Sequence, residues 1–164
     1  MAKTTETTKV EKTETETKAT ALTYYYAVGR RREAAARIRL YVCNEENLTI
    51  AGKTHKKGDI EVNGRTVATY FPGEVSQKIY LEPLRTTNAL NRFVITAKVE
   101  GGGPQGQLGA VIHGISRALV KVDPEKNKPI LRKRGFLTRD PRAKQRRKAG
   151  YAQKARKKKQ SPKR

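Results

Sequence analysis

Apolar and polar side chains alternate strictly in the stretch between residues 37 and 42. The apolar residues Ile38, Leu40 and Val42 are separated by Arg37, Arg39 and Tyr41. A period of two residues is typical of a strand in a sheet that buries one face. We therefore predict a strand here, with its two arginines on the face opposite the core.

Several other stretches have the composition of short strands. We predict strands over residues 24–28, running into a turn at Gly29, and over 48–51, 60–62 and 93–99. Asn63-Gly64 is a favoured turn dipeptide and should close the strand before it. The intervening stretch GKTHKKGD, residues 52–59, is expected to be a loop.

One helix is indicated clearly by apolar positions that recur every three or four residues. They predict a helix over 108–122, which Asp123-Pro124 should stop, and they are Leu108, Val111 or Ile112, Ile115, Leu119 and Val122. Two shorter helices are expected over 66–71 and 75–84, with Pro83 ending the second. The order of elements predicts an α+β fold, a small sheet with helices packed on one side.

A stripe of three polar residues runs beside the apolar face of the long predicted helix. His113, Arg117 and Lys121 follow one another at four-residue intervals. Such a stripe suits either solvent or phosphate groups of a nucleic acid, and the spacing leaves both interpretations open.

The two ends of the chain differ in charge but share a lack of apolar residues. Residues 1–23 contain nine Thr, four Glu and four Lys and are predicted to be a disordered, neutral extension. Residues 131–164 contain 16 Lys or Arg and one acid, so this stretch carries +15 of the net +22. We expect a globular domain over 24–130, with a net charge of +7, followed by an extended basic tail.

So strong a positive charge is typical of proteins that bind nucleic acid. A membrane surface is the rival partner, but the tail has no apolar helical face, and the chain shows no membrane span or signal peptide. We therefore expect a cytoplasmic protein. The single cysteine, Cys43, excludes an internal disulfide or a multi-cysteine zinc site and is expected to be a small buried thiol.

A glycine motif raises the possibility of a dinucleotide cofactor. Gly101, Gly103 and Gly106 match G-x-G-x-x-G between a predicted strand and a predicted helix. The acid that should follow a second strand is missing, because Asp123 instead ends a helix. We interpret the motif as a loop that allows close backbone approach, with helix-start amides available to an RNA phosphate.

Other catalytic constellations are equally weak. The two histidines, His55 and His113, have no carboxylate or serine at a telling spacing, and His55 is interpreted as a solvated loop residue. We expect no enzyme, no cofactor and no metal.

Four stretches in the same order resemble the bacterial-type ribosomal protein S9 (uS9) family. They are VGRRREAAARIRL at 28–40, VNGR at 62–65, GGGPQGQLGAVIHGISRAL at 101–119 and LTRDPR at 137–142. The resemblance implies a structural protein in the head of the small ribosomal subunit. It also implies a fold like the second domain of ribosomal protein S5, with a left-handed βαβ crossover, and no homo-oligomer. Neighbouring ribosomal proteins would be partners.

The same resemblance, with the charge, gives the candidate contacts with ribosomal RNA (rRNA). They are Arg30, Arg31, Arg32, Arg37, Arg65, Gly101, Gly102, Gly103, Gln107, His113, Arg117, Arg139, Arg142, Arg146, Arg147 and Lys148. The family's tail reaches the transfer RNA in the peptidyl site, which assigns that contact to Lys163 and Arg164. A tail that fills a gap between RNA strands should be cationic and unfolded until RNA neutralises it.

The chain departs from the family pattern at three places. Ile112 stands where an arginine usually precedes the helix histidine, Gln160-Ser161-Pro162 replaces an aromatic near the tip, and residues 1–23 are an addition. Two alternatives to a ribosomal role also stay open from the residues alone, a free nucleic-acid chaperone or nucleoid protein and an enzyme.

Overall fold

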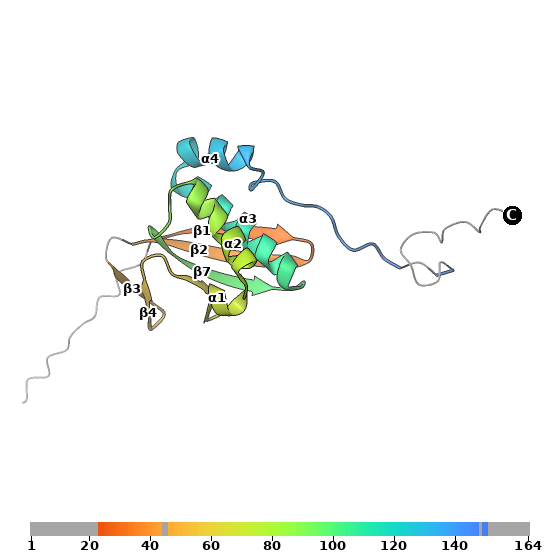
Figure 1. Ribbon diagram of the computed structural model, residues 1–164, viewed down its shortest axis with the longest axis horizontal. Helices are drawn as coiled ribbons and strands as arrows, with labels where there is room; N and C mark the ends of the chain where they lie inside the picture. The colour runs from red at the N-terminus through yellow and green to blue at the C-terminus, as the bar shows by residue number, and fades with distance from the viewer. Residues whose placement is uncertain (1–22, 44–45, 148, 151–164) are drawn as a thin grey trace, which may run out of the picture.

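A five-stranded sheet forms the centre of the protein, as the computed structural model shows for residues 23–43, 46–147 and 149–150 (Figure 1). Its strand order is β1-β2-β7-β5-β6. The strands are β1 (Tyr24–Arg31), β2 (Ala34–Val42), β7 (Phe93–Glu100), β5 (Ile60–Val62) and β6 (Arg65–Thr66). Only the β5–β7 pair is parallel, and the other neighbours are antiparallel.

Helices cover one face of this sheet, so the predicted α+β fold with helices on one side is confirmed (Figure 1). They are α1 (Val67–Tyr70), α2 (Glu74–Thr86), α3 (Pro104–Val122) and α4 (Pro124–Lys133). The helix-facing side chains of the strands, such as Ile38, Leu40 and Ile95, are fully buried against Ile115 and Leu119 of α3. The apolar residues that recur every two positions in β2 and every three or four positions in α3 thus form one core.

A separate hairpin of β3 (Asn47–Ile50) and β4 (Lys53–Lys56) packs beside the sheet. Leu48 and Ile50 contact a small second core made of Tyr41, Cys43 and Val94. The loop predicted for residues 52–59 was therefore wrong over β4. Its polar sequence forms a strand because Leu48 lies opposite His55 and Thr49 opposite Thr54 in an antiparallel ladder.

Two glycines allow α3 to lie very close to β1. A Cβ atom on Gly29 would fall 2.0 Å from the backbone oxygen of Ala110 and 2.3 Å from the backbone nitrogen of Gly114. Gly29 was expected in a turn, but it lies inside β1 and is buried. Its lack of a side chain is needed for helix packing rather than for a turn.

Two prolines behave differently from the prediction. Pro83 lies within α2, which continues to Thr86. Proline lacks an amide donor, but the carbonyl oxygen of Pro83 still accepts from the Thr87 amide at 3.2 Å, which holds the last turn. Pro124 begins α4, a helix that the sequence did not suggest, and the Asp123 side chain caps it by accepting from the Lys126 amide at 3.2 Å.

The packed body continues past residue 130. Leu131 of α4 is fully buried, and Phe136 and Leu137 pack against the main core. The division into residues 24–130 and 131–164 stays a prediction about domain organisation. The extension over residues 1–23 lies outside the described residues apart from Thr23.

Candidate nucleic-acid interface

Two turns meet at one end of the sheet. The β1–β2 turn contains Arg32 with a φ of 54°, and the turn before α3 contains Gly101 and Gly102 with φ of 73° and 65°. A Cβ atom on Gly101 would lie 2.7 Å from the carbonyl oxygen of Glu33, so the glycines permit close approach of the two turns. The interpretation of this motif as a close-contact loop therefore agrees with the structure.

Gln107, a partly exposed residue in the first turn of α3, hydrogen-bonds to the glycine turn. Its Nε2 donates to the carbonyl oxygen of Gly101 at 3.1 Å, and its Oε1 accepts from the Tyr70 hydroxyl at 2.9 Å. Both ends of this side chain are already hydrogen-bonded within the protein. Its position therefore supports the turn at Gly101 and Gly102.

The first turn of α3 opens beside two cations. Gly103 is its N-cap residue, and a Cβ atom built there meets nothing within 4 Å. Arg32 and Lys144 line the same pocket as residues 102–106, and so does Glu33, which offsets one of the two positive charges. Helix-start amides and two cationic side chains together favour an anion such as phosphate.

Asp140 ties the start of the basic tail to the body. Its carboxylate accepts hydrogen bonds from the Arg142 amide at 3.1 Å and from the Arg142 guanidinium, the shortest at 2.7 Å from Nη2, and it lies 3.7 Å from Arg31. The hydrogen bonds from Arg142 hold the pKa of this carboxyl well below its usual range. Arg31 in turn lies against α3, because a Cβ atom on Gly109 would be 2.2 Å from its Cδ.

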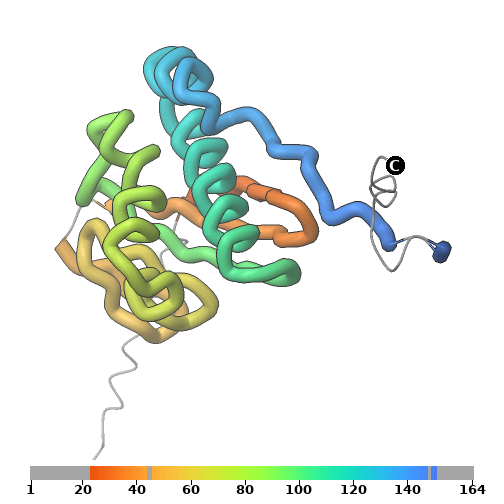
Figure 2. The backbone as a smooth tube through the Cα atoms, turned by 45° about the vertical axis from the view of Figure 1, so that its right-hand side comes forward, coloured from red at the N-terminus to blue at the C-terminus, as the bar shows by residue number. Residues whose placement is uncertain are grey.

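This arrangement gives the tail a defined starting direction. Figure 2 shows the chain after α4 running past α3 towards the β1–β2 turn before it leaves the body. The exposed arginines Arg139, Arg142, Arg146 and Arg147 lie on this segment. The structure thus brings the tail, Arg31, Arg32 and the glycine turn to one end of the molecule, which we call the basic end.

The polar stripe on α3 lies along the outer edge of β1. Arg117 donates to the carbonyl oxygen of Val28 at 2.5 Å, and Lys121 donates to that of Tyr26 at 2.6 Å. The amide of Arg30 donates to Nδ1 of His113 at 3.2 Å. The stripe therefore stabilises the packing of α3 on β1, a role that the sequence did not suggest. Only part of each side chain is left to contact solvent or phosphate.

Burial lowers the pKa of His113. The charges of Arg117 and Arg139 lower it further, against an opposing hydrogen bond with the backbone at Leu137. The neutral imidazole is the form that can accept from the Arg30 amide. His113 therefore joins β1, α3 and the start of the tail as an uncharged group.

The remaining candidates lie elsewhere. Arg30 and Arg37 are exposed on the helix-free face of the sheet, where Arg37 pairs with Glu100. Arg65 belongs to β6, at the opposite edge of the sheet from β1. The predicted contacts Lys148, Lys163 and Arg164 lie outside the described residues.

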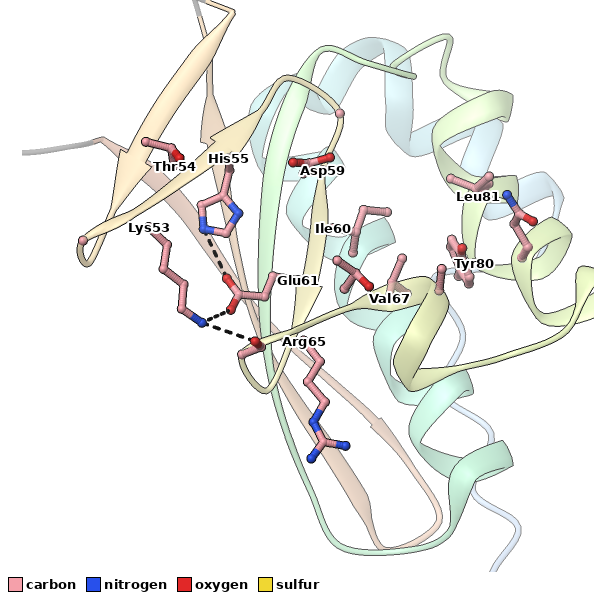
Figure 3. A pocket seen from close by; sticks show the side chains of 16 residues that line it. Lys53, Thr54, His55, Asp59, Ile60, Glu61, Arg65, Val67, Tyr80 and Leu81 are labelled. Carbon is pink, nitrogen blue, oxygen red and sulfur yellow. Dashed lines mark hydrogen bonds and ion pairs between the residues drawn. The ribbon is translucent and has the colours of Figure 1, made fainter.

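His55 is not the solvated loop residue that the sequence suggested. It lies in β4 with 9% of its surface exposed, and its Nε2 is 3.2 Å from the Glu61 carboxylate (Figure 3). Lys53 pairs with the same carboxylate at 3.3 Å. The cluster joins the β3–β4 hairpin to β5, which makes it a structural contact.

Neither a metal site nor a membrane-spanning helix is found among the residues that the structure describes. In that part of the chain, no group of three His, Cys, Asp or Glu residues could hold a metal ion. Likewise, none of the helices described is long and apolar enough to cross a membrane.

Sequence reasoning missed three features of this surface. Asp140 was noted only as the one acid of a basic tail, although an isolated acid among cations is itself a signal of pairing. Lys144 lines the pocket at the glycine turn through a meeting of distant segments that no local pattern reveals. The exposed tyrosines of β1 were assigned only to a strand.

Comparison with known proteins identifies the family. The family model "Ribosomal protein S9/S16" matches residues 29–164. Proteins named small ribosomal subunit protein uS9 from Leifsonia xyli and Cutibacterium acnes are 44% and 46% identical over 138 residues, 84% of this chain and 74% and 72% of theirs. That of Mycobacterium bovis is 46% identical over 137 residues, 84% of this chain and 81% of its own.

The match covers the whole described body from Gly29 onward, including the turns, α3 and the tail segment that form the basic end. The family consists of structural ribosomal proteins rather than enzymes, which confirms the prediction of no catalytic activity. The chain belongs to the ribosomal protein S9 family.

Proposed function

We propose that this chain is a structural constituent of the small ribosomal subunit in the cytoplasm and binds the rRNA of its head. The observation that carries this proposal is the convergence of Arg32, the open first turn of α3 and Lys144 at one end of the body. The tail leaves the body from this same end. Folded and extended cations would therefore contact the same RNA region.

The two parts of this basic end would bind RNA in different ways. The glycine turn brings backbone amides close to a phosphate, because side chains are absent at Gly101–Gly103. The arginines of the tail offer planar forks that match phosphate oxygens. An extended cationic chain can enter spaces between RNA strands that a folded domain cannot, and it becomes ordered when its charge is neutralised.

The tip of the tail would reach the transfer RNA in the peptidyl site. Lys163 and Arg164 are the residues proposed for this contact. The 14 residues after Gly150 could span on the order of 45 Å at about 3.3 Å per residue if extended. This length supports a contact far from the folded body.

The finer fold assignment belongs to the same proposal. The parallel pair β5 and β7 is joined through β6, α1 and α2, so the connection is a βαβ unit. We propose that its crossover is left-handed, as in the second domain of ribosomal protein S5. Neighbouring head proteins and rRNA would be its partners, with no homo-oligomer and no membrane.

Sedimentation tests this function. An epitope-tagged full-length chain expressed in a bacterium should sediment with small subunits and remain bound through a wash in moderate salt. A chain ending at Arg142 keeps the body and the Asp140 contacts, and it should be released at lower salt. Recovery of the full-length protein only in free fractions, or spread over nucleic acid of every kind, would contradict the proposal and favour a nucleic-acid chaperone.

A further inference from the structure

The face of the sheet that the helices leave free carries aromatic and cationic side chains. On β1 the even-numbered residues lie on this face, because Ala27 and Gly29 are buried on the other. Register places Tyr26 opposite Arg39, and Arg39 opposite Thr96. A groove runs over this face between the strands and the β3–β4 hairpin, and its lining includes Tyr24, Tyr26, Arg37, Arg39, Tyr41 and Lys98.

Two tyrosines on this face are unusually accessible. Tyr24 and Tyr26 have 46% and 41% of their surface exposed. The Arg39 guanidinium lies 5.2 Å from the centre of the Tyr24 ring, and the Tyr24 and Tyr41 rings are 5.5 Å apart. The Tyr24 ring thus lies next to the Arg39 guanidinium and at a tilt of 51° to the Tyr41 ring, and Tyr26 lies two residues further along the same strand.

The charge of the groove is positive. Its cations include Arg37, Arg39 and Lys98. Glu100 pairs with Arg37 and lies 3.9 Å from Lys98. The acid of the groove lining, Glu61, is paired with Lys53 and His55. These two acids offset only part of the positive charge, so the groove keeps a net positive charge. Such a face is suited to binding a polyanion.

We propose that this helix-free face binds an unpaired segment of RNA, with bases stacked on Tyr24 and Tyr26. Residues two apart on a strand point the same way and lie about 6.5–7 Å apart, which suits two successive unstacked bases. Arg37, Arg39 and Lys98 would contact the adjoining phosphates. The inference rests on the proposed function and adds a second RNA surface to the basic end.

The chemistry of the groove favours RNA over a protein partner. A protein interface usually has an apolar core with few charges at its centre. Here the centre of the face is occupied by Tyr26, Arg39 and Thr96, which lie side by side in the sheet register. Exposed aromatic rings flanked by cations are the common platform for single-stranded RNA.

Binding of full-length protein to a 12-residue oligouridine tests the proposal. Tyr26→Leu removes the ring but keeps an apolar side chain, and Tyr26→Phe is the matched control. Tyr26→Leu should weaken binding about 5-fold or more, with the slope of log affinity against log salt unchanged. Tyr26→Phe should bind as the wild type does. Arg39→Gln should instead reduce the slope by about 0.7, one phosphate contact.

A crosslinking experiment places the contact independently of affinity. Oligouridine containing 4-thiouridine should crosslink under ultraviolet light to the peptide that holds Tyr24 and Tyr26. Crosslinks confined to tail peptides, together with equal affinities of the Leu and Phe variants, would overturn the proposal. In intact small subunits, crosslinks from this face to a neighbouring protein in place of RNA would overturn it in favour of a protein interface.

These outcomes are separable from those of the proposed function. A wild-type chain that sediments with small subunits while Tyr26→Leu binds oligouridine normally would leave the ribosomal role intact and remove only the second RNA surface. Circular dichroism melting of each variant should show an unchanged fold, because Tyr26 is not part of either core.

Discussion

The guanidinium of Arg117 donates a hydrogen bond to the backbone carbonyl of Val28, and the two atoms are 2.5 Å apart. Val28 lies on β1, the edge strand of the five-stranded sheet, and Lys121 makes the same kind of contact with Tyr26. An uncovered edge exposes carbonyl and amide groups that could pair with another chain. Two side chains of α3 therefore cover carbonyl groups on the free edge of β1 and keep them from pairing with another strand.

Arg117→Ala is expected to lower the free energy of unfolding by about 1 kcal/mol, because one charge-assisted hydrogen bond at an exposed site is lost. Urea denaturation followed by circular dichroism measures this. Arg147→Ala removes the same charge from the exposed tail and should change stability by less than about 0.5 kcal/mol. Equal stabilities of the two variants would contradict a structural role for Arg117.

Gly29→Ala is expected to destabilise the protein by at least about 2 kcal/mol. The added methyl group would lie 2.0 Å from the carbonyl oxygen of Ala110, so β1 and α3 must separate. Gly103→Ala is the control, because its methyl group meets nothing within 4 Å and its φ of −120° suits any residue. Thermal unfolding should separate the two variants, and matching melting temperatures would exclude the close approach.

The sequence predicted the elements whose pattern is local and missed those that depend on distant partners. The alternation at Ile38 and Leu40 and the spacing of Ile115 and Leu119 were sufficient for β2 and α3, since burial of one face dictates both. The strand at 53–56 was missed because its pairing with β3 and the contact of His55 with Glu61 provide the stability. α4 was missed because Asp123-Pro124 was interpreted only as the stop of α3, whereas Asp123 caps a second helix that begins at Pro124.

Stability should decrease as the pH falls below about 6.5, the usual pKa of an unfolded histidine. The folded-state pKa of His113 is lower, so the unfolded chain binds a proton first and acidification favours unfolding until the folded pKa is passed. A proton on Nδ1 would also oppose the Arg30 amide. Unfolding free energies of the wild type and His113→Gln should therefore be compared between about pH 7.5 and 5.

In this comparison the wild type should lose stability more steeply than His113→Gln, because only the wild type contains this partly buried imidazole. His55 is present in both proteins and contributes equally. Parallel pH profiles would show that His113 has the same pKa in the folded and unfolded chains.

The sequence was sufficient to predict which kinds of residue would contact RNA, but not where these residues lie in the fold. Charge alone marked the tail, and the glycine motif marked the turn before α3. Neither could show that Lys144 returns to that turn, nor that Arg117 is occupied by β1, because both contacts join segments far apart in the chain. The structure distinguishes Arg65, which lies at the opposite edge of the sheet, from the cations that meet at the basic end, whereas charge alone treats them alike.

Truncation after Arg142 should flatten the salt dependence of RNA binding. The removed segment contains 11 Lys or Arg, and if 6–10 of them meet phosphates, the slope of log affinity against log salt should lose roughly 4–7 units. The body and the Asp140 contacts remain, so the melting temperature should be unchanged. Filter binding over a salt series measures the slope, and an unaltered slope would assign the affinity to the body.

Deletion of Lys163 and Arg164 separates anchoring from the proposed contact with transfer RNA. Nine Lys or Arg lie between residues 132 and 148, so the shortened chain keeps enough charge to anchor in the subunit. Assembly should be near normal, whereas transfer RNA should bind the peptidyl site more weakly, because two contacts with its backbone are lost. The loss should not depend on the codon, since phosphate contacts carry no sequence information.

Filter binding of deacylated transfer RNA to isolated small subunits, with the full-length or the shortened protein, measures this effect. The difference in transfer RNA affinity should be clearest at raised salt. Salt screens long-range attraction, so direct contacts then make a larger share of the affinity. Subunits carrying Gln160→Tyr restore an aromatic side chain near the tip and serve as a matched comparison. Equal affinities of full-length and shortened proteins across the salt series would mean that Pro162 and the missing aromatic direct the tip away from the transfer RNA.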